Sequence, residues 1–343
     1  MNKKRWLSAV KISAFLLLGI TLVWFSFKDL KNEEIDLLKS SLKNANPFWL
    51  IFSLVIGMIS HIIRAYRWNM LVEPMGYRPR FLNSFYAVMT GYLVNYGVPR
   101  LGEISRCTLL TKYEKIPFTK TLGTVIAERV LDIIFFFIVF FLMLVTQYQK
   151  LAEYFNTYIS PPLIQKWNNI LQNKTLFVIL IFCLLLIFIF LVMIRNKIRG
   201  KFVDKLKQFA RGFTEGLSSV KQVKKPGYFI FLTALIWVCY YAGVHIFMYC
   251  IPSSIELGFS ESLTAFVFGS VMVMITPGGI GAYPYAIQKI LLFVYLVPEV
   301  TGASIGWLSW LSSFVLIVLV GLFSLLALPF YNKNYQPVVP QES

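Results

Sequence analysis

Long apolar runs constrain this chain more than any other feature, because several of them have the length that a helix needs to cross a bilayer. Residues 12–27, 119–145, 175–194 and 303–330 are examples, and about 20 apolar residues in a helix span the hydrocarbon core. Of the 343 residues, 57% are hydrophobic and only 14% are charged, which does not suit a soluble domain of this size. The sequence therefore predicts an all-α polytopic integral membrane protein.

The distribution of positive charge sets the expected orientation. The formal net charge is +17, and the lysines and arginines fall mainly in short segments between the apolar runs, most densely in residues 195–225. Such segments stay in the cytoplasm. We therefore expect a multi-pass protein of the bacterial inner (cell) membrane with a cytoplasmic loop at 195–225 and both termini in the cytoplasm. Nucleic-acid binding is not expected, because no basic recognition motif accompanies the charge.

Two apolar segments are interrupted by proline and glycine. The first, residues 81–98, ends at Pro99, and Gly102 follows shortly after it. Proline removes a backbone donor and glycine permits sharp turns, so the helix should break there. A full crossing by this segment would place the lysines of residues 112–120 outside the cell. A re-entrant hairpin keeps them inside, and the positive-inside rule favours it.

The second interruption is Pro277-Gly278-Gly279-Ile280-Gly281, which follows an apolar run from Ser262 to Ile275. Parity predicts that it too is a re-entrant hairpin, entering from the opposite face, so that the two tips meet near the midplane of the membrane. Gly/Pro-interrupted segments at corresponding places in two halves indicate a transporter site. Glycine and proline are also common in ordinary membrane helices. The sequence thus leaves an inverted repeat open.

These expectations give one transmembrane domain over residues 1–343, with about six full spans and two hairpins. The first half is 1–145, with its hairpin at Pro99. The second half is 175–330, with its hairpin at Pro277, and residues 331–343 form a short cytoplasmic tail.

Ionisable residues occur in three groups inside or beside the apolar segments. They are Arg64 and Arg67; Arg100, Glu103 and Arg106; and Glu128, Arg129 and Asp132. Each costs roughly 2.5–3.5 kcal/mol at the centre of a membrane helix, so they need mutual pairing. We expect Arg100, Glu103, Arg106, Glu128 and Asp132 to converge in one polar cavity reached from the cytoplasmic side, because each alone would be too costly in lipid. Non-helical backbone at membrane depth is tolerated only where protein or water surrounds it.

Spacing predicts some of the pairs. Arg129 and Asp132 are three residues apart and can pair on one helix face, whereas Glu128 needs a cation from elsewhere, either Arg100 or Arg106. In the alternative interpretation the span starts at Val130, and Glu128 and Arg129 are interfacial anchors. Planar guanidinium groups suit phosphate through bidentate bonds. No catalytic residue, metal site or cofactor is predicted, and whether the chain is an enzyme stays open.

Four motifs resemble, in the same order, those of the lysylphosphatidylglycerol synthase transmembrane region, the flippase-like half of the multiple peptide resistance factor. They are Arg64-Ala-Tyr-Arg-Trp68, Pro99-Arg-Leu-Gly-Glu103 with Arg106, Glu128-Arg-Val-Leu-Asp132 and Pro277-Gly-Gly-Ile-Gly281. The resemblance implies lipid translocation between leaflets. Members often carry a glutamate shortly after the Pro-Gly-Gly-x-Gly turn, where this chain has Ala282-Tyr-Pro284. The aminoacyltransferase domain is not expected, since the sequence runs only a dozen residues past its last span.

The sequence therefore predicts a protein that moves a polar, aminoacylated or glycosylated lipid between leaflets, with membrane phospholipid as partner and a homo-oligomer left open. A membrane-embedded head-group transferase with Glu128 or Asp132 as base, or a non-transporting accessory subunit of a lipid-modifying system, are the alternatives. The candidate lipid-binding residues are Arg64, Arg67, Pro99, Arg100, Gly102, Glu103, Arg106, Glu128, Arg129, Asp132, Pro277, Gly278, Gly279 and Gly281.

Overall fold

The protein is helical throughout the part of the chain that its computed structural model describes, which is residues 21, 23–28, 32–98, 100–162, 164–165, 222–254 and 256–337. The helices are α2 (Asn32–Lys43), α3 (Pro47–Val72), α4 (Phe81–Gly97), α5 (Leu101–Glu114), α6 (Phe118–Thr146), α7 (Tyr148–Tyr154), α11 (Pro226–Phe247), α12 (Phe259–Ile275), α13 (Ala282–Tyr295) and α14 (Glu299–Tyr331). Short 3-10 turns extend α3 and α11. The predicted all-α fold is confirmed.

Four segments are long and apolar enough to cross a bilayer. They are Pro47–Met75, Phe118–Thr146, Pro226–Cys250 and Glu299–Tyr331. Two further spans predicted at residues 12–27 and 175–194, and the basic loop 195–225, lie wholly or largely outside the described residues. The four segments that are described confirm a multi-pass membrane protein.

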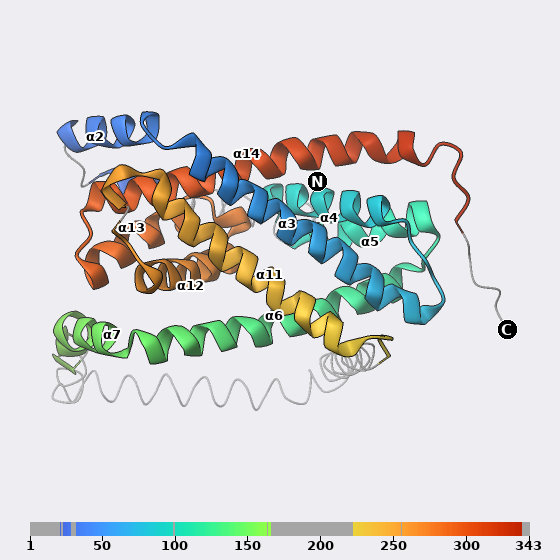
Figure 1. The fold of residues 1–343 in the computed structure, drawn as a ribbon, viewed down its shortest axis with the longest axis horizontal. Helices are drawn as coiled ribbons and strands as arrows, with labels where there is room; N and C mark the ends of the chain where they lie inside the picture. The colour runs from blue at the N-terminus through green and yellow to red at the C-terminus, as the bar shows by residue number, and fades with distance from the viewer. Residues whose placement is uncertain are drawn as a thin grey trace, which may run out of the picture.

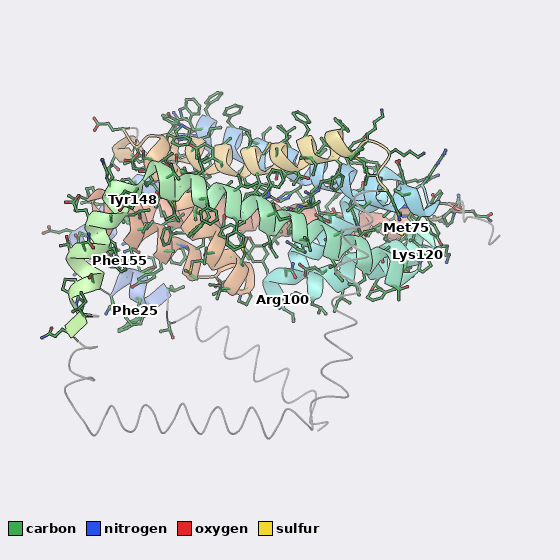
Figure 2. The ribbon with its side chains drawn as sticks, turned by 90° about the horizontal axis from the view of Figure 1, so that it is seen from below. Phe25, Met75, Arg100, Lys120, Tyr148 and Phe155 are labelled. Atoms are coloured by element: carbon green, nitrogen blue, oxygen red, sulfur yellow. The ribbon has the colours of Figure 1, made fainter. Side chains whose placement is uncertain are left out.

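The connections between these segments gather at two ends of the molecule. Figure 1 shows α3 ending, and α6 and α11 beginning, at one end, while α7 lies at the other. Figure 2 places Met75 and Lys120 at the first end, Tyr148 and Phe155 at the second, and Arg100 between them. Because α3 ends where α6 begins, the intervening α4 and α5 return to the side from which they started.

The first hairpin is formed by α4 and α5, which pack against each other on either side of a break at residues 98–100. Arg100 has a left-handed backbone with φ of 63° at the start of α5, and Pro99 lies outside the described residues. The two helices approach so closely that a Cβ atom on Gly102 would lie 2.0 Å from the Gly91 carbonyl oxygen. Glycine at this position is therefore what lets the hairpin close.

The second hairpin consists of α12, a 3-10 turn at Pro277–Gly279, and α13. Its tip touches the tip of the first hairpin, because the Tyr96 ring lies against the left-handed Gly278, where a Cβ atom would be 2.1 Å from the ring. Trp310 Nε1 of α14 donates to the Gly278 carbonyl at 2.9 Å. The predicted meeting of the two tips is thus present in the structure.

Helix α14 runs along both hairpins. Its first turns pack on α13, where Gly306 approaches the Pro284 backbone; its middle carries Trp310 on the tip; and its later turns pack on α4, where Gly321 contacts Leu93. At 33 residues, α14 is about 50 Å long, roughly the combined length of the two 17-residue helices α4 and α12. The hairpins therefore lie tip to tip and enter from opposite ends.

The second hairpin repeats the first in detail. Helices α4 and α12 are both 17 residues long, and α5 and α13 are both 14. The residue directly after α5, Lys115, and the residue directly after α13, Leu296, both have a φ of 57°. Each is followed by a buried Ile or Val and then by a proline. Serine, alanine and glycine recur at matching positions: Ser84 and Ser262, Ala87 and Ala265, Gly91 and Gly269. We call α3 to α6 the first unit and α11 to α14 the second unit.

Candidate functional site

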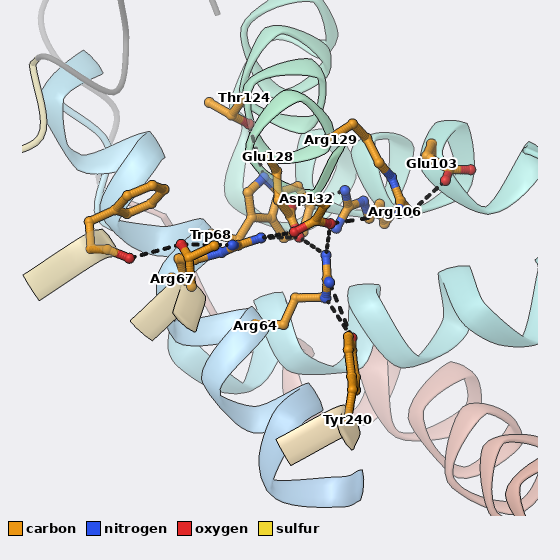
Figure 3. A network of polar contacts seen from close by, with 12 residues as sticks. Arg64, Arg67, Trp68, Glu103, Arg106, Thr124, Glu128, Arg129, Asp132 and Tyr240 are labelled. Atoms are coloured by element: carbon orange, nitrogen blue, oxygen red, sulfur yellow. Dashed lines mark hydrogen bonds and ion pairs between the residues drawn. The ribbon is translucent and has the colours of Figure 1, made fainter. Parts of the chain in front are cut away.

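A buried network of ionisable side chains connects four helices (Figure 3). Its members are Arg64 and Arg67 of α3, Arg106 of α5, and Glu128 and Asp132 of α6, with Thr233 and Tyr240 of α11 as uncharged partners. Each of the five charged residues is at most 6% exposed. Of the five residues predicted to converge, Arg106, Glu128 and Asp132 meet here and are joined by Arg64 and Arg67. Glu103 lies at the edge of the network and Arg100 lies outside it.

Glu128 is the centre of the network. One carboxylate oxygen contacts Arg64 Nη1 and lies 3.1 Å from Arg67 Nη2, while the other lies 3.0 Å from Arg106 Nη2. The residue is fully buried, so the interpretation of Glu128 as an interfacial anchor does not hold. The sequence predicted that either Arg100 or Arg106 pairs with Glu128, and in the structure the partner is Arg106.

Asp132, one turn further along α6, accepts from both arginines of α3. Its oxygens lie 2.8 Å from Arg64 Nη1 and 3.2 Å from Arg67 Nη2. Each of these two arginines thus bridges two carboxylates, which satisfies several guanidinium donors at once. The spacing of Arg64 and Arg67 places both on the face of α3 that turns toward α6.

Two hydroxyl groups of α11 hold the same arginines from the second unit. The Arg64 guanidinium donates to the Tyr240 hydroxyl at 3.1 Å from Nη2, and Arg67 Nη1 donates to Thr233 Oγ1 at 2.9 Å. Sequence reasoning missed both residues. The available signal was weak: they are polar side chains seven residues apart, two helical turns, on one face of an apolar helix.

At the edge of the network a half-exposed pair continues toward the first hairpin. Arg129 Nη2 lies 2.6 Å from Glu103 Oε1, whereas its predicted partner Asp132 is 3.9 Å away. Glu103 is therefore the main partner of Arg129. Taken together, four guanidinium groups face three carboxylates, so the network carries one positive charge in excess.

A narrow crevice opens beside this pair. It is lined by Val88, Gly91, Tyr92, Asn95, Gly102, Glu103, Arg106 and Arg129, and its volume of about 10 Å³ is room for about one water molecule. Arg106 Nε and Glu103 Oε2 are buried and have no hydrogen-bond partner among the described residues. A polar group entering the crevice would meet both, but no lipid head group fits without movement of the hairpin.

The remaining candidate residues lie elsewhere. Arg100 is exposed and lies outside the network at the start of α5, because the left-handed turn there precedes the buried face of the helix. Pro277, Gly278, Gly279 and Gly281 form the tip of the second hairpin, where three glycines have positive φ. These four residues shape the contact with the first hairpin and do not touch the charged network.

Comparison with known proteins gives two matches. The family model described as "Lysylphosphatidylglycerol synthase TM region" matches residues 10–321. A UPF0104 membrane protein of Methanocaldococcus jannaschii is 30% identical over 142 residues, which are 40% of this chain and 42% of that protein. No solved structure matches the chain. The family match covers most of the sequence and includes every candidate site residue, so the chain belongs to the lysylphosphatidylglycerol synthase TM region family.

Proposed function

We propose that this protein moves a polar lipid between the two leaflets of the bacterial inner membrane, as a flippase-like transporter. The observation that carries the proposal is the buried network at the first hairpin, which holds an excess positive charge between segments that cross the membrane. Ionisable groups at such depth are costly and mark substrate pathways and sites. The family match supports a lipid context, because the family is described as the transmembrane region of a lysylphosphatidylglycerol synthase.

The chemistry of the network suits an anionic head group. Arg64, Arg67 and Arg106 present forked donors that carboxylates now occupy, and phosphate offers oxygens of the same kind. A phosphate could exchange with Glu128 or Asp132 for these donors, and the displaced carboxylate could accept a cationic group of an aminoacylated lipid. The proposed substrates are therefore phospholipids, including aminoacylated or glycosylated ones.

The lipid would reach the network through the crevice of the first hairpin. Gly102, Glu103, Arg106 and Arg129 are among the residues that line this crevice. The acyl chains would stay in the bilayer while the head group passes toward the contact between the two tips, at Tyr96 and Gly278. We propose that the candidate lipid-binding residues predicted from the sequence act along this route.

The proposed orientation places the ends of α3 and α14, and the start of α6, in the cytoplasm. Basic residues occur at these helix ends: Arg78 and Arg80 follow α3, Lys112 is in the last turn of α5, Lys120 is in the first turn of α6, and Lys333 follows α14. Labelling of a cysteine introduced into the 195–225 loop tests this orientation in intact cells. Reaction with an impermeant reagent added outside the cells would contradict it and support the opposite orientation.

Reconstitution tests the function itself. The purified protein is placed in liposomes that contain fluorescent phosphatidylglycerol in one series and fluorescent lysylphosphatidylglycerol in a second, and exchange is measured by the loss of fluorescence to an impermeant quencher. We expect exchange with the native protein, loss of exchange with Arg106→Ala, and no change with Ser309→Ala, which alters the equivalent helix of the second unit.

Two results would contradict the proposal. Exchange no faster than in protein-free liposomes, with every probe, would favour an accessory subunit. A new lipid species in the mass spectrum of the incubated liposomes, formed without exchange, would favour a head-group transferase with Glu128 or Asp132 as base.

A further inference from the structure

Two polar clusters close the open ends of the two hairpins, at opposite ends of the molecule. We define the first latch as Asn83, Glu114, Asn332 and Tyr335. We define the second latch as Gln147, Lys150, Ser260 and Tyr295. Each latch ties the base of one hairpin to the end of a long helix from the other unit, α14 in the first case and α6 in the second.

The first latch is a closed set of amide and carboxylate contacts. Asn83 and Asn332 exchange two side-chain hydrogen bonds, at 2.8 and 2.7 Å. Asn83 also donates to Glu114 Oε1, and the Tyr335 hydroxyl donates to Glu114 Oε2 at 2.9 Å. Burial and the Glu114 carboxylate raise the pKa of Tyr335 to about 12, so this hydroxyl keeps its proton at neutral pH.

The second latch joins the corresponding helix ends with different side chains. Gln147 Nε2 donates to Ser260 Oγ at 3.0 Å, and the Tyr295 hydroxyl donates to Gln147 Oε1 at 3.1 Å. The Lys150 ammonium lies 4.5 Å from the centre of the Tyr295 ring, a cation–π contact. No latch residue belongs to the charged network.

The two latches correspond at three of their four positions, the exception being Asn83, the third residue of α4, and Ser260, the second residue of α12. Asn332 and Gln147 each cap the C-terminal end of a long helix, and Tyr335 and Lys150 each follow that cap by three residues. Glu114 and Tyr295 are each the last residue of the second helix of a hairpin. Two independent surface contacts would not reproduce this order, so the latches are a repeated part of the architecture.

Buried residues lie on the inner side of each latch. Going inward along α5 from Glu114, the chain passes Leu110 and Cys107, both buried, before it reaches Arg106 of the network. Behind Tyr295 of the other latch, Leu291 packs with Cys250 in a buried cluster beside the second hairpin. A native cysteine therefore lies behind each latch, and both thiols are free.

We infer that the two latches are alternating gates, one on each side of the membrane, and that release of a latch lets its hairpin base part from the long helix of the other unit. This inference rests on the proposed function. It explains how a head group could reach a network that has room for only about one water molecule in the closed arrangement. Opening of the first latch exposes the network's side of the first hairpin, and opening of the second exposes the far end of the second hairpin.

The rate at which each native cysteine reacts with N-ethylmaleimide tests the inference in the full-length protein in detergent. One reporter protein keeps Cys107 and the other keeps Cys250, with the remaining cysteines replaced by alanine. We expect Asn332→Ala to raise the reaction rate of Cys107 about fivefold and to leave Cys250 unchanged. Gln147→Ala should do the reverse. A fivefold change is what the loss of about one net hydrogen bond allows.

The chain offers a matched control for each change. Asn334→Ala and Gln149→Ala remove an exposed amide two residues beyond each latch residue, and neither should alter the rate at either cysteine. If Asn332→Ala is too unstable to purify, Tyr335→Phe removes one hydrogen bond to Glu114 and keeps the amide pair.

Two outcomes would overturn the inference. One is an equal rise at both cysteines in either variant, which would mean a general loosening of the fold. The other is no change at either cysteine in any variant. The thiol rates need no lipid movement, so they judge the latches even if no labelled lipid exchanges in liposomes.

Discussion

The two units share a backbone and differ in what they enclose. Glu128 is the eleventh residue of α6 and is surrounded by three arginines, whereas Ser309, the eleventh residue of α14, donates to the Gly306 carbonyl one turn away. The next position is Arg129 in the first unit and Trp310 in the second. The same scaffold thus holds an ion network on one side and hydroxyl and aromatic groups on the other.

This difference separates folding from function. The second unit builds hairpin helices of the same 17 and 14 residues without the buried ion network. The charges of the first unit are therefore not needed to form the hairpin. Since buried ion pairs often add no stability over apolar residues of similar volume, the network is best explained by a task that only the first unit performs.

The glycines show the same contrast. Gly91 in α4 receives the backbone of Gly102, whereas Gly269 at the matching position of α12 receives the Tyr283 ring, 2.6 Å from where a Cβ atom would lie. Bringing two backbones together in the first hairpin leaves a crevice beside Glu103 and Arg106. In the second hairpin the ring takes up that space. The polar route is thus confined to one unit.

The largest effect is expected from Glu128→Gln. The change keeps the shape of the side chain but leaves three buried guanidinium groups without their shared carboxylate, and breaking such a pair costs about 3–5 kcal/mol. Unfolding of the detergent-solubilised protein by heat or by denaturant should show this loss of stability. Lipid exchange should also stop. Ser309→Ala at the matching position should cost less than about 1 kcal/mol. Equal losses in the two units would remove the functional distinction between them.

The next largest effect is expected from Gly102→Ala. The added methyl group would lie 2.0 Å from the Gly91 carbonyl oxygen, so the two helices must separate, and overpacking of this kind costs about 1–3 kcal/mol. Gly97→Ala, near the same break, meets no atom within 4 Å and serves as the control. If Gly102→Ala left the thermal unfolding temperature unchanged, the hairpin would be more loosely packed than its backbone contact indicates.

The sequence was sufficient for the helices and for the two hairpins, because apolar length, Pro/Gly breaks and charge bias are each local signals. The predicted break after Val98 and the start of α6 agree with the structure to within one or two residues. It also identified the ionisable members of the network, because each such residue is costly in an apolar segment, but it wrongly added Arg100, which lies outside the network.

Their partners could not be predicted in the same way. Arg129 pairs with Glu103 because the hairpin folds α5 against α6, and no spacing along one helix contains that information. Thr233 and Tyr240 belong to a segment more than 160 residues from Arg67 and Arg64. The internal repeat could only be left open from the sequence, since few identical residues mark it and the equal helix lengths emerge only when the helix ends are known.

A smaller effect is expected from Trp310→Phe at the meeting point of the tips. The change removes the hydrogen bond from Trp310 Nε1 to the Gly278 carbonyl and keeps most of the ring contact with Phe314, so it should cost about 0.5–1.5 kcal/mol. Unfolding of the variant measures this directly. Phe314→Leu, which keeps the hydrogen bond, shows how much of the loss belongs to ring packing instead.

The smallest effect is expected at the edge of the network, where Arg129 and Glu103 are both partly exposed to their surroundings. Arg129→Ala leaves Glu103 without its partner, so the single change should destabilise the protein more than Arg129→Ala combined with Glu103→Gln. Because the side chain of Arg129 is 42% exposed, the difference should stay below about 1 kcal/mol. The four proteins of this cycle can be compared by denaturant unfolding. In all four proteins Asp132 still contacts Arg64 and Arg67. Additive losses of stability would mean that the Arg129–Glu103 pair is an interfacial contact that does not shape the crevice.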